Sequence, residues 1–558
     1  MEFRAVVDEV LDGYFHHYPV HATEIGHHAF DGLWPDLTDA GRRARLDWLA
    51  DAQARVEAEA ADRLSQDEAI DRRILLEYLA AARFGEEVLD EGAWNPLTYV
   101  YLLGNGLFLL LAREFAPRAD RLRSAASRLA SLPDALEQAR HSLTDGGSRP
   151  TSRFHTEKAV ERMPGLLDLV DTALEEAGVL EDAGLRDEVH AAAEIARGAI
   201  RRFSDWLRDE LLPGSTGDFR LGTDLYAQKF GHSLKTDMTP AELEQRAASA
   251  YDEVRAEMLR LARELWPAWL GDEPLPDDEG QTVRRVLDAI AVQHPRADEL
   301  LDFCRAENGR IEAFIRERDL VGLADEPLQI VWTPRFLRSF GGAMLIPPGP
   351  LDRGLDSFFA ITPMPDEWSE ERRESYLRED NSRMLRLLTI HEAVPGHYLQ
   401  LAYSNRTDSL VRSIFQSGVF AEGWAVYLTQ VMMDIGYGAD DPALMLVHWK
   451  FYLRSITNTL MDLRIHTGSM SEQEAMTLMV DGGFQEEGEA ANKWDRARLS
   501  STQLCEYFLG SVGMHDLEEE ARRRAAAESH EFEYRPFLES VLAHGTPSLP
   551  VIRDILFP

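Results

Sequence analysis

Cysteine is almost absent from this chain, which has only Cys304 and Cys505 among 558 residues. So few cysteines exclude a small disulfide-held scaffold and favour a cytosolic protein with buried thiols, although the two could form one bridge. Long hydrophobic runs are also missing, because the most apolar window, residues 99–112, is short and interrupted by glycine. Residues 1–15 contain several acids and no apolar signal-peptide core. We therefore expect a soluble, cytoplasmic protein with no membrane partner.

Basic residues are scarce relative to acidic ones, at 59 against 97, which gives a net charge of -38. A surface of that sign repels phosphate backbones, so nucleic-acid binding is excluded as a function. The 44% of apolar residues is ordinary for a folded globular protein. A chain of this length exceeds one compact core and predicts two or three lobes.

Helical periodicity dominates the chain. Leu, Ile, Val and Ala recur three and four residues apart, with Glu and Arg between them, as amphipathic helices require. The clearest stretches are Asp71–Arg83, Ala159–Ala177, Leu185–Arg208 and Pro240–Trp266. A hydroxyl residue, Thr239, precedes Pro240, which is a typical helix start.

Short β-favouring runs interrupt this pattern between Leu328 and Pro363, where LQIVWT, AMLI and SFFAI are separated by Pro and Gly clusters. Helical periodicity returns from about Glu371. The sequence therefore predicts a mainly α protein with a small β-sheet. The acidic loop Gly271–Gly280 predicts a boundary between an N-terminal helical half, residues 1–270, and a C-terminal half, residues 281–558. A surface loop within one lobe explains its composition equally well.

Candidate metal ligands lie in the stretch Thr389–Gln400, TIHEAVPGHYLQ. In the common zinc-peptidase pattern H-E-x-x-H, two histidines four residues apart share one helix face. His391 and His397 are six residues apart, which on a regular helix means about 9 Å of rise and divergent directions. Pro395 cannot donate a backbone N–H, and Gly396 tolerates unusual backbone angles. This pair predicts a bulge of about two residues that returns His397 to the side of His391.

Glu392, next to the first histidine, would then point at metal-bound water as the general base. The third ligand is expected on a following helix, where Glu422 lies off the apolar stripe of Phe420–Met433 and Gly423 leaves room for another backbone. Two histidines and one glutamate leave a fourth position open, as in a catalytic site for one zinc ion per chain. A chance match in a proline-broken helix is the alternative reading of these residues.

Two of these stretches, TIHEAVPGHYLQ and the following FAEGWAVYL, closely resemble the paired motifs of the bacterial DUF885 family, whose members look like gluzincin metallopeptidases. The likeness covers nearly the whole chain. Similar to the family's outlying signatures are Pro19–Asp31, Gly222–Phe230 and Gln503–Gly510 (QLCEYFLG). The resemblance implies a gluzincin-like active site, which we expect in a cleft between two lobes, with zinc on His391, His397 and Glu422.

Besides zinc, an oxyanion needs hydrogen-bond donors. Tyr507 is a candidate because it lies in the segment that resembles the C-terminal signature. His466 is a second candidate, since Asp462 four residues earlier on a helix could orient its imidazole. A buried tyrosine with a satisfied hydroxyl and a histidine at a helix end are the structural alternatives.

Two further parts of the sequence could bind the substrate. Arg454 and Arg464 could each hold a substrate carboxylate, or form surface salt bridges instead. An edge strand, either Gly341–Ile346 or Ser357–Ile361, could pair with an extended peptide, or the strands could simply cap a helical lobe.

The sequence thus predicts a zinc metallopeptidase that hydrolyses oligopeptides, with a peptide or another small amide as its partner. A zinc hydrolase of a non-peptide amide or ester would use the same ligands and base. A non-catalytic peptide-binding protein of the same fold is a third class, and the presence of Glu392 argues against it.

Overall fold

The computed structural model describes residues 3–145, 147–333, 343–365, 367–468 and 470–558. The chain forms two compact units. Unit 1 comprises Met1–Phe219 and the short segment Pro348–Leu355, and unit 2 comprises Arg220–Pro347 and Asp356–Pro558. The chain therefore leaves unit 2 once, between its second and third strands, to contribute one segment to unit 1.

Unit 1 is built from helices. They are α1 (Phe3–His17), α2 (Pro19–Glu24), α3 (Asp39–Ala58), α4 (Gln66–Phe84), α5 (Glu91–Trp94), α6 (Leu97–Ala112), α7 (Arg118–Asp145), α8 (Arg153–Gly178), α9 (Ala183–Trp206) and α10 (Leu212–Gly214). The predicted amphipathic helices of this region are confirmed as α4, α8 and α9, which bury their Leu, Ile, Val and Ala stripes.

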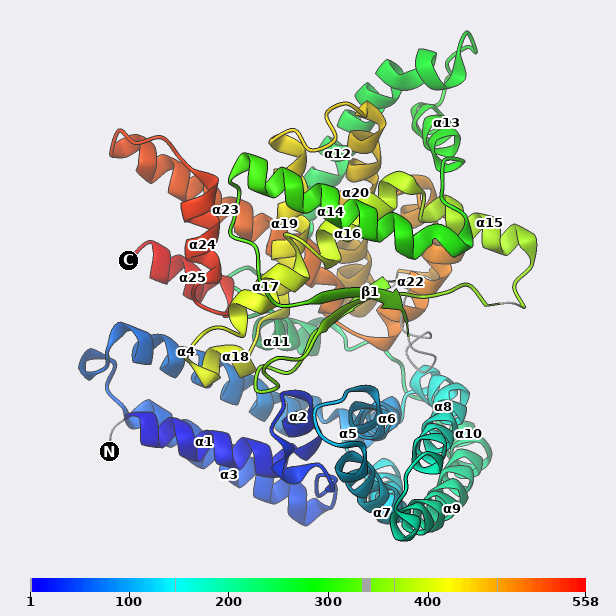
Figure 1. Ribbon diagram of the computed structural model, residues 1–558, viewed down its shortest axis with the longest axis vertical. Helices are drawn as coiled ribbons and strands as arrows, with labels where there is room; N and C mark the ends of the chain where they lie inside the picture. The colour runs from blue at the N-terminus through cyan, green and yellow to red at the C-terminus, as the bar shows by residue number, and fades with distance from the viewer. Residues whose placement is uncertain (1–2, 146, 334–342, 366, 469) are drawn as a thin grey trace. The chain divides into compact units, whose positions relative to one another are not determined.

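Unit 2 combines helices with a small sheet. Its helices are α11 (Thr223–Leu234), α12 (Pro240–Leu270), α13 (Glu279–Ala291), α14 (Leu300–Arg318), α15 (Glu370–Glu379), α16 (Ser382–Glu392), α17 (His397–Ser404), α18 (Leu410–Ile414), α19 (Gly418–Asp434), α20 (Pro442–Thr467), α21 (Glu472–Met476), α22 (Glu487–Leu499), α23 (Glu506–Ala527), α24 (Tyr534–Leu542) and α25 (Leu549–Leu556). Figure 1 shows α16, α19 and α20 gathered at the centre of this unit, where they contact one another.

Helix α12 begins at the predicted residue. The Thr239 hydroxyl accepts the backbone N–H of Glu242, and the Glu242 carboxylate accepts the backbone N–H of Thr239, so two otherwise unpaired N–H groups are satisfied. Because α12 packs on α20, it belongs to unit 2, and the two units divide at Phe219 and Arg220 instead of at residues 271–280. Residues 271–278 are therefore a surface connection between α12 and α13, as in the alternative interpretation of this loop, and α13 begins at Glu279.

The predicted strands are confirmed as β1 (Leu328–Trp332), β2 (Ala343–Ile346) and β3 (Ser357–Ile361), in the order β1-β3-β2. Leu328 pairs with Ser357 in the parallel β1–β3 ladder. Ala343 pairs with Ile361 in the antiparallel β2–β3 ladder.

One edge-strand prediction is wrong, because Ser357–Ile361 is the central strand and both of its edges are already paired. Its SFFAI run is almost entirely buried, as expected for a strand covered on both sides. The other candidate, β2, is an edge strand, and residues 341–342 of that candidate lie outside the described residues.

The sheet supports the metal motif directly. Its apolar side chains, Ile330, Phe359 and Ile361, form one buried cluster with Leu385 of α16 and Ala393. Burial of these side chains from water fixes the C-terminal end of α16 against the strands. The small sheet therefore lies beside the first candidate ligand, as predicted.

Cys304 and Cys505 are both buried and form no disulfide with each other, as the expectation of buried thiols requires. In the described part of the chain, no single helix is long and apolar enough to cross a membrane. One sharply bent pair, Gln66–Trp94 with Leu97–Ala112, passes that test by length and composition alone.

Candidate metal centre

The helix that contains the first histidine stops at Glu392, and a new helix, α17, starts at His397. Between them the chain turns, with the Val394–Pro395 peptide bond in the cis form. The predicted bulge within one helix is thus a complete break followed by a restart. Pro395 cannot donate a helical hydrogen bond, so the α16 ladder ends in front of it.

Gly396 is required for the tightness of this turn. Its backbone N–H donates to the Ile390 carbonyl over 3.0 Å. A Cβ atom at position 396 would lie 1.9 Å from the carbonyl oxygen of His391, so any other residue would force the two segments apart. The requirement comes from this close approach, since the φ of Gly396 is -75°.

The turn brings the predicted ligands together. The Nε2 atoms of His391 and His397 lie 3.6 and 3.4 Å from the Oε2 atom of Glu422. The two imidazole rings are 4.7 Å apart between centroids and nearly perpendicular, with an angle of 83°. All three side chains can offer one ligand atom within 4.8 Å of the others. The predicted return of His397 to the side of His391 is confirmed.

Glu422 reaches this position because α19 is held on two sides. The Trp424 indole N–H donates to the Pro395 carbonyl over 2.8 Å, which ties α19 to the turn between the histidines. On the other side α19 packs against α23 with almost no space between the backbones. A Cβ on Gly423 would lie 2.3 Å from the carbonyl carbon of Gly510, which confirms the predicted close approach.

The electrostatics of the three residues are coupled. Burial raises the pKa of Glu422, but the charges of His397 and His391 outweigh it and hold the pKa far below its usual range. Burial lowers the pKa of His397, while the charge of Glu422, followed by that of Glu392, raises it above its usual value. Glu392 is therefore close enough to act electrostatically on the ligand set, and its side chain is partly exposed.

The ligand set fits a zinc ion. With bonds of about 2.0–2.1 Å, the ligand atoms of a tetrahedral zinc lie roughly 3.3–3.4 Å apart, which is close to the nitrogen–oxygen separations observed here. The buried Oε2 atom of Glu422 has no hydrogen-bond donor among the described residues, so this oxygen can still bind a cation. Two imidazoles and one carboxylate are also the donor types of catalytic zinc sites.

Tyr507 lies near the ligands at the start of α23. Burial, and after it the charge of Glu422, raises the pKa of Tyr507 to about 12. Its hydroxyl oxygen accepts a hydrogen bond of 3.0 Å from the Arg496 guanidinium, which also donates to the Gln503 side chain over 2.8 Å. The Tyr507 hydroxyl proton is thus left for another acceptor.

Glu506, the neighbour of Tyr507, is a second acid beside Glu422. Burial and then the charge of Glu422 raise the pKa of Glu506 to about 8. Neither Glu506 nor Arg496 was among the predicted site residues. Glu506 lies within the QLCEYFLG stretch and could have been noted there, whereas Arg496 lies in a charged helix with no local signal.

The side chain of His466 makes contacts that hold neighbouring segments together. Its Nε2 atom lies 2.9 and 2.8 Å from the carbonyl oxygens of Ala497 and Ser500, and its ring stacks on Tyr226. Asp462 accepts hydrogen bonds from the Tyr226 hydroxyl over 2.6 Å and from the Thr502 backbone over 2.9 Å. The imidazole thus holds the segment before α23 in place, and the proposed role as an oxyanion donor is wrong.

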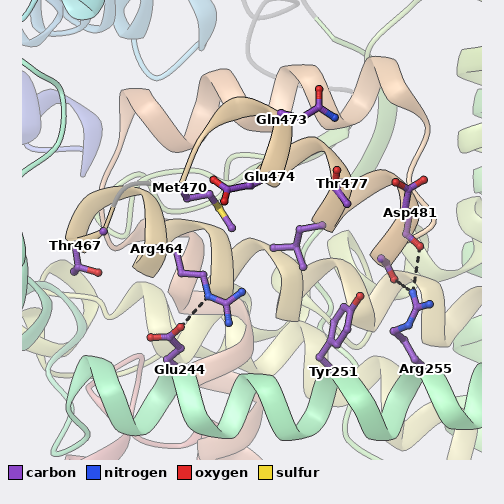
Figure 2. A pocket seen from close by; sticks show the side chains of 13 residues that line it. Glu244, Tyr251, Arg255, Arg464, Thr467, Met470, Gln473, Glu474, Thr477 and Asp481 are labelled. Atoms are coloured by element: carbon purple, nitrogen blue, oxygen red, sulfur yellow. Dashed lines mark hydrogen bonds and ion pairs between the residues drawn. The ribbon is translucent and has the colours of Figure 1, made fainter.

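The two candidate carboxylate-binding arginines differ. Arg464 is bonded to Glu244 over 2.8 Å and lines a pocket of about 870 Å³ between α12, α20 and α21, whose lining includes none of the candidate metal ligands (Figure 2). Arg464 therefore forms a salt bridge, which was the alternative to binding a substrate carboxylate. Arg454 instead lies over the ring of Phe451, which itself packs edge-on against His391. The predicted cleft beside the metal stays a prediction.

Comparison with known proteins identifies the family of the chain. Residues 19–556 match the family described as bacterial protein of unknown function (DUF885), and the chain therefore belongs to that family. None of the curated proteins matches the chain.

Two solved structures are similar to this chain over its whole length. One, from Shewanella oneidensis, is provisionally described as a lipoprotein of unknown function; it shares 31% identity over 100% of both chains, with a TM-score of 0.87. The other, from Colwellia psychrerythraea, is provisionally described as a lipoprotein; it shares 14% identity over 99% of this chain and 98% of its own, with a TM-score of 0.82. The second likeness concerns the fold alone.

Proposed function

We propose that the protein is a gluzincin-like zinc metallopeptidase that hydrolyses oligopeptides, with Glu392 as the general base. The observation that supports it most strongly is the convergence of two imidazole nitrogens and one carboxylate oxygen at zinc-ligand spacing, next to a glutamate that zinc binding itself does not need.

Zinc in such a site supplies Lewis acidity to a carbonyl group and to water. Glu392, adjacent in sequence to a ligand, takes a proton from the attacking water and delivers it to the leaving nitrogen. Tyr507 donates its hydroxyl proton to the developing oxyanion, and the Arg496 hydrogen bond orients the phenol for this. The raised pKa of Tyr507 keeps the phenol protonated at neutral pH.

The test is the Glu392→Gln variant. It keeps the size of the side chain and removes the base, so we expect hydrolysis of a peptide library to fall by about 10²–10⁴-fold while zinc content stays unchanged. Elemental analysis and mass spectrometry of the cleavage products measure the two quantities. The matched control is Glu371→Gln, which neutralises an exposed acid on α15 and should leave both unchanged.

Unchanged turnover in Glu392→Gln would remove Glu392 from the mechanism. Zinc-loaded protein that cleaves amide or ester compounds but no peptide would assign the site to the broader class of zinc hydrolases.

The cytoplasmic location stays a prediction. The provisional lipoprotein descriptions of the two similar structures favour a different location for those proteins. Fractionation of cells that produce this chain, with antibody detection, distinguishes the cases: recovery with the membranes would contradict the prediction.

A further inference from the structure

Arginines in this acid-rich chain are commonly paired with carboxylates, as Arg464 with Glu244 and Arg386 with Glu307. Two arginines beside the metal centre depart from this. Among the described residues, the Arg454 guanidinium makes no hydrogen bond or ion pair, and that of Arg496 donates only to the neutral side chains of Gln503 and Tyr507. Guanidinium N–H groups without a carboxylate partner are donors available to an anionic ligand.

Arg454 is separated from the metal centre by a single ring. The Phe451 ring packs edge-on against His391 with 5.6 Å between centroids, and the Cζ atom of Arg454 lies 4.9 Å above the same ring. Phe451 and Arg454 are three residues apart on α20, so they share one helix face. The aromatic contact restricts the guanidinium, which lowers the entropy lost when it binds a ligand.

Two cations on α22, Lys493 and Arg496, form a positive group with Arg454 that extends towards Glu422. Lys493 and Arg496 are three residues apart and share a helix face. The pKa of Lys493 falls to about 8. Burial is the largest cause, and the charges of Arg496 and Arg454 add to the lowering. Lys493 is thus within electrostatic reach of both arginines, while Arg496 is within reach of Glu422.

The acids nearest to these cations are largely engaged. Glu379 pairs with Lys450 over 2.8 Å, and Glu489 lies 3.6 Å from Lys493. Asp380 forms no ion pair with Arg454 among the described residues, and burial followed by the charge of Glu379 raises its pKa to about 7. Glu379 and Asp380 are therefore within electrostatic reach of Arg454, but among the described residues neither carboxylate forms an ion pair with its guanidinium.

We propose that Arg454, assisted by Lys493 and Arg496, binds the C-terminal carboxylate of a peptide substrate beside the metal, so that the protein acts as an exopeptidase at the C-terminal end. The inference rests on the proposed function and adds its substrate class. Only one aromatic ring lies between the guanidinium and a ligand, and a peptide spans about 3.3–3.6 Å per residue. The scissile bond therefore lies within a few residues of the chain end.

The reaction is a hydrolysis: the amide C–N bond breaks, the oxygen of water bonds to the carbonyl carbon, and a proton goes to the nitrogen of the released C-terminal fragment. A C-terminal amide in place of the carboxylate removes the charge that Arg454 would bind and leaves the scissile bond intact. Matched peptides that differ only in this group are therefore the appropriate probes.

The experiment compares N-acetylated pentapeptides that end in a free carboxylate or in an amide, using zinc-loaded protein. We expect kcat/KM to be about 100-fold higher for the carboxylate peptide, because removing one partner of a buried charge pair weakens binding by about that factor. Arg454→Gln should remove this preference by lowering only the carboxylate value, and Arg454→Lys, which keeps the charge but loses the bidentate geometry, should retain part of it. The control Arg464→Gln should leave both values unchanged, because that arginine pairs with Glu244 elsewhere.

Equal cleavage of both peptides would overturn the carboxylate subsite and leave the proposed peptidase intact. A preference that survives in Arg454→Gln would assign the carboxylate to the metal instead, and would also overturn the inference.

Absence of any cleavage would contradict the proposed function, so binding is measured separately by calorimetry. At least tenfold tighter binding of the carboxylate peptide to the wild type, lost in Arg454→Gln, would support the subsite without catalysis. Equal binding of the two peptides would reject it.

Discussion

Unit 1 and unit 2 each contain histidines close to carboxylates, and the two groups differ in what their polar atoms contact. In unit 1, both ring nitrogens of His28 have partners: Nδ1 lies 3.0 Å from Asp31 and Nε2 lies 2.9 Å from Asp352. The ring also stacks on Phe115. In unit 2, the imidazole nitrogens of His391 and His397 face Glu422 at distances too long for good hydrogen bonds.

The contacts of His28 are those of a structural histidine, whereas His391 and His397 are candidate metal ligands. The His28 network is complete within the protein, since Asp31 also accepts from Thr23, which in turn accepts from Arg128. It fixes the segment Pro348–Leu355 in unit 1, as shown by its bond to Asp352. In the candidate metal centre, by contrast, the buried Oε2 atom of Glu422 has no hydrogen-bond donor among the described residues.

The largest expected effect concerns zinc content. His397→Ala should reduce the zinc content of the purified protein from about one ion per chain to a small fraction, because two protein ligands do not hold a catalytic zinc. His28→Gln, in the complete network, should retain the full amount. Elemental analysis of both variants after incubation with zinc measures this. Equal zinc in wild type and His397→Ala would place the metal elsewhere and remove the contrast between the two histidines.

The second effect concerns the support of Glu422. Gly423→Ala should destabilise unit 2 by about 3 kcal/mol, because the added methyl group collides with the backbone of Gly510 and pushes α19 from α23. Gly309→Ala is the control: it lies within α14, a Cβ there contacts nothing within 4 Å, and it should stabilise by up to about 1 kcal/mol. Denaturant unfolding of the two variants gives the comparison. A neutral Gly423→Ala would show that the two helices can separate without cost.

The smallest effect concerns pH. Burial lowers the pKa of His28, but the hydrogen bonds and charges of Asp31 and Asp352 outweigh it and raise the pKa to about 9 from an ordinary value of 6.5. The resulting stabilisation is complete below about pH 6.5 and is lost as the pH rises through about 9. His28→Gln should therefore cost roughly 2 kcal/mol at pH 6 and much less at pH 10. Thermal unfolding of wild type and variant across this range measures the difference, and a difference independent of pH would contradict a charged His28.

The residues of the metal centre were predictable from the sequence to a large extent. The spacing of His391 and His397 made sense only with a break, and Pro395 and Gly396 supplied one by local backbone chemistry. Glu422 could be selected because it lies off an apolar helical stripe. His466 was misassigned since its true partners, two carbonyl groups more than thirty residues away in sequence, leave no local trace.

The sequence by itself determined where most helices and strands form and which three side chains can bind a metal, because caps, proline, glycine and apolar periodicity act over a few residues. Only the tertiary structure decided that β3 is the central strand and that α12 belongs to unit 2. It also decided that Arg454 lies over Phe451 with no ion-pair partner among the described residues, while Arg464 is paired. These outcomes depend on which distant side chains pack together, and packing is decided by the whole chain at once.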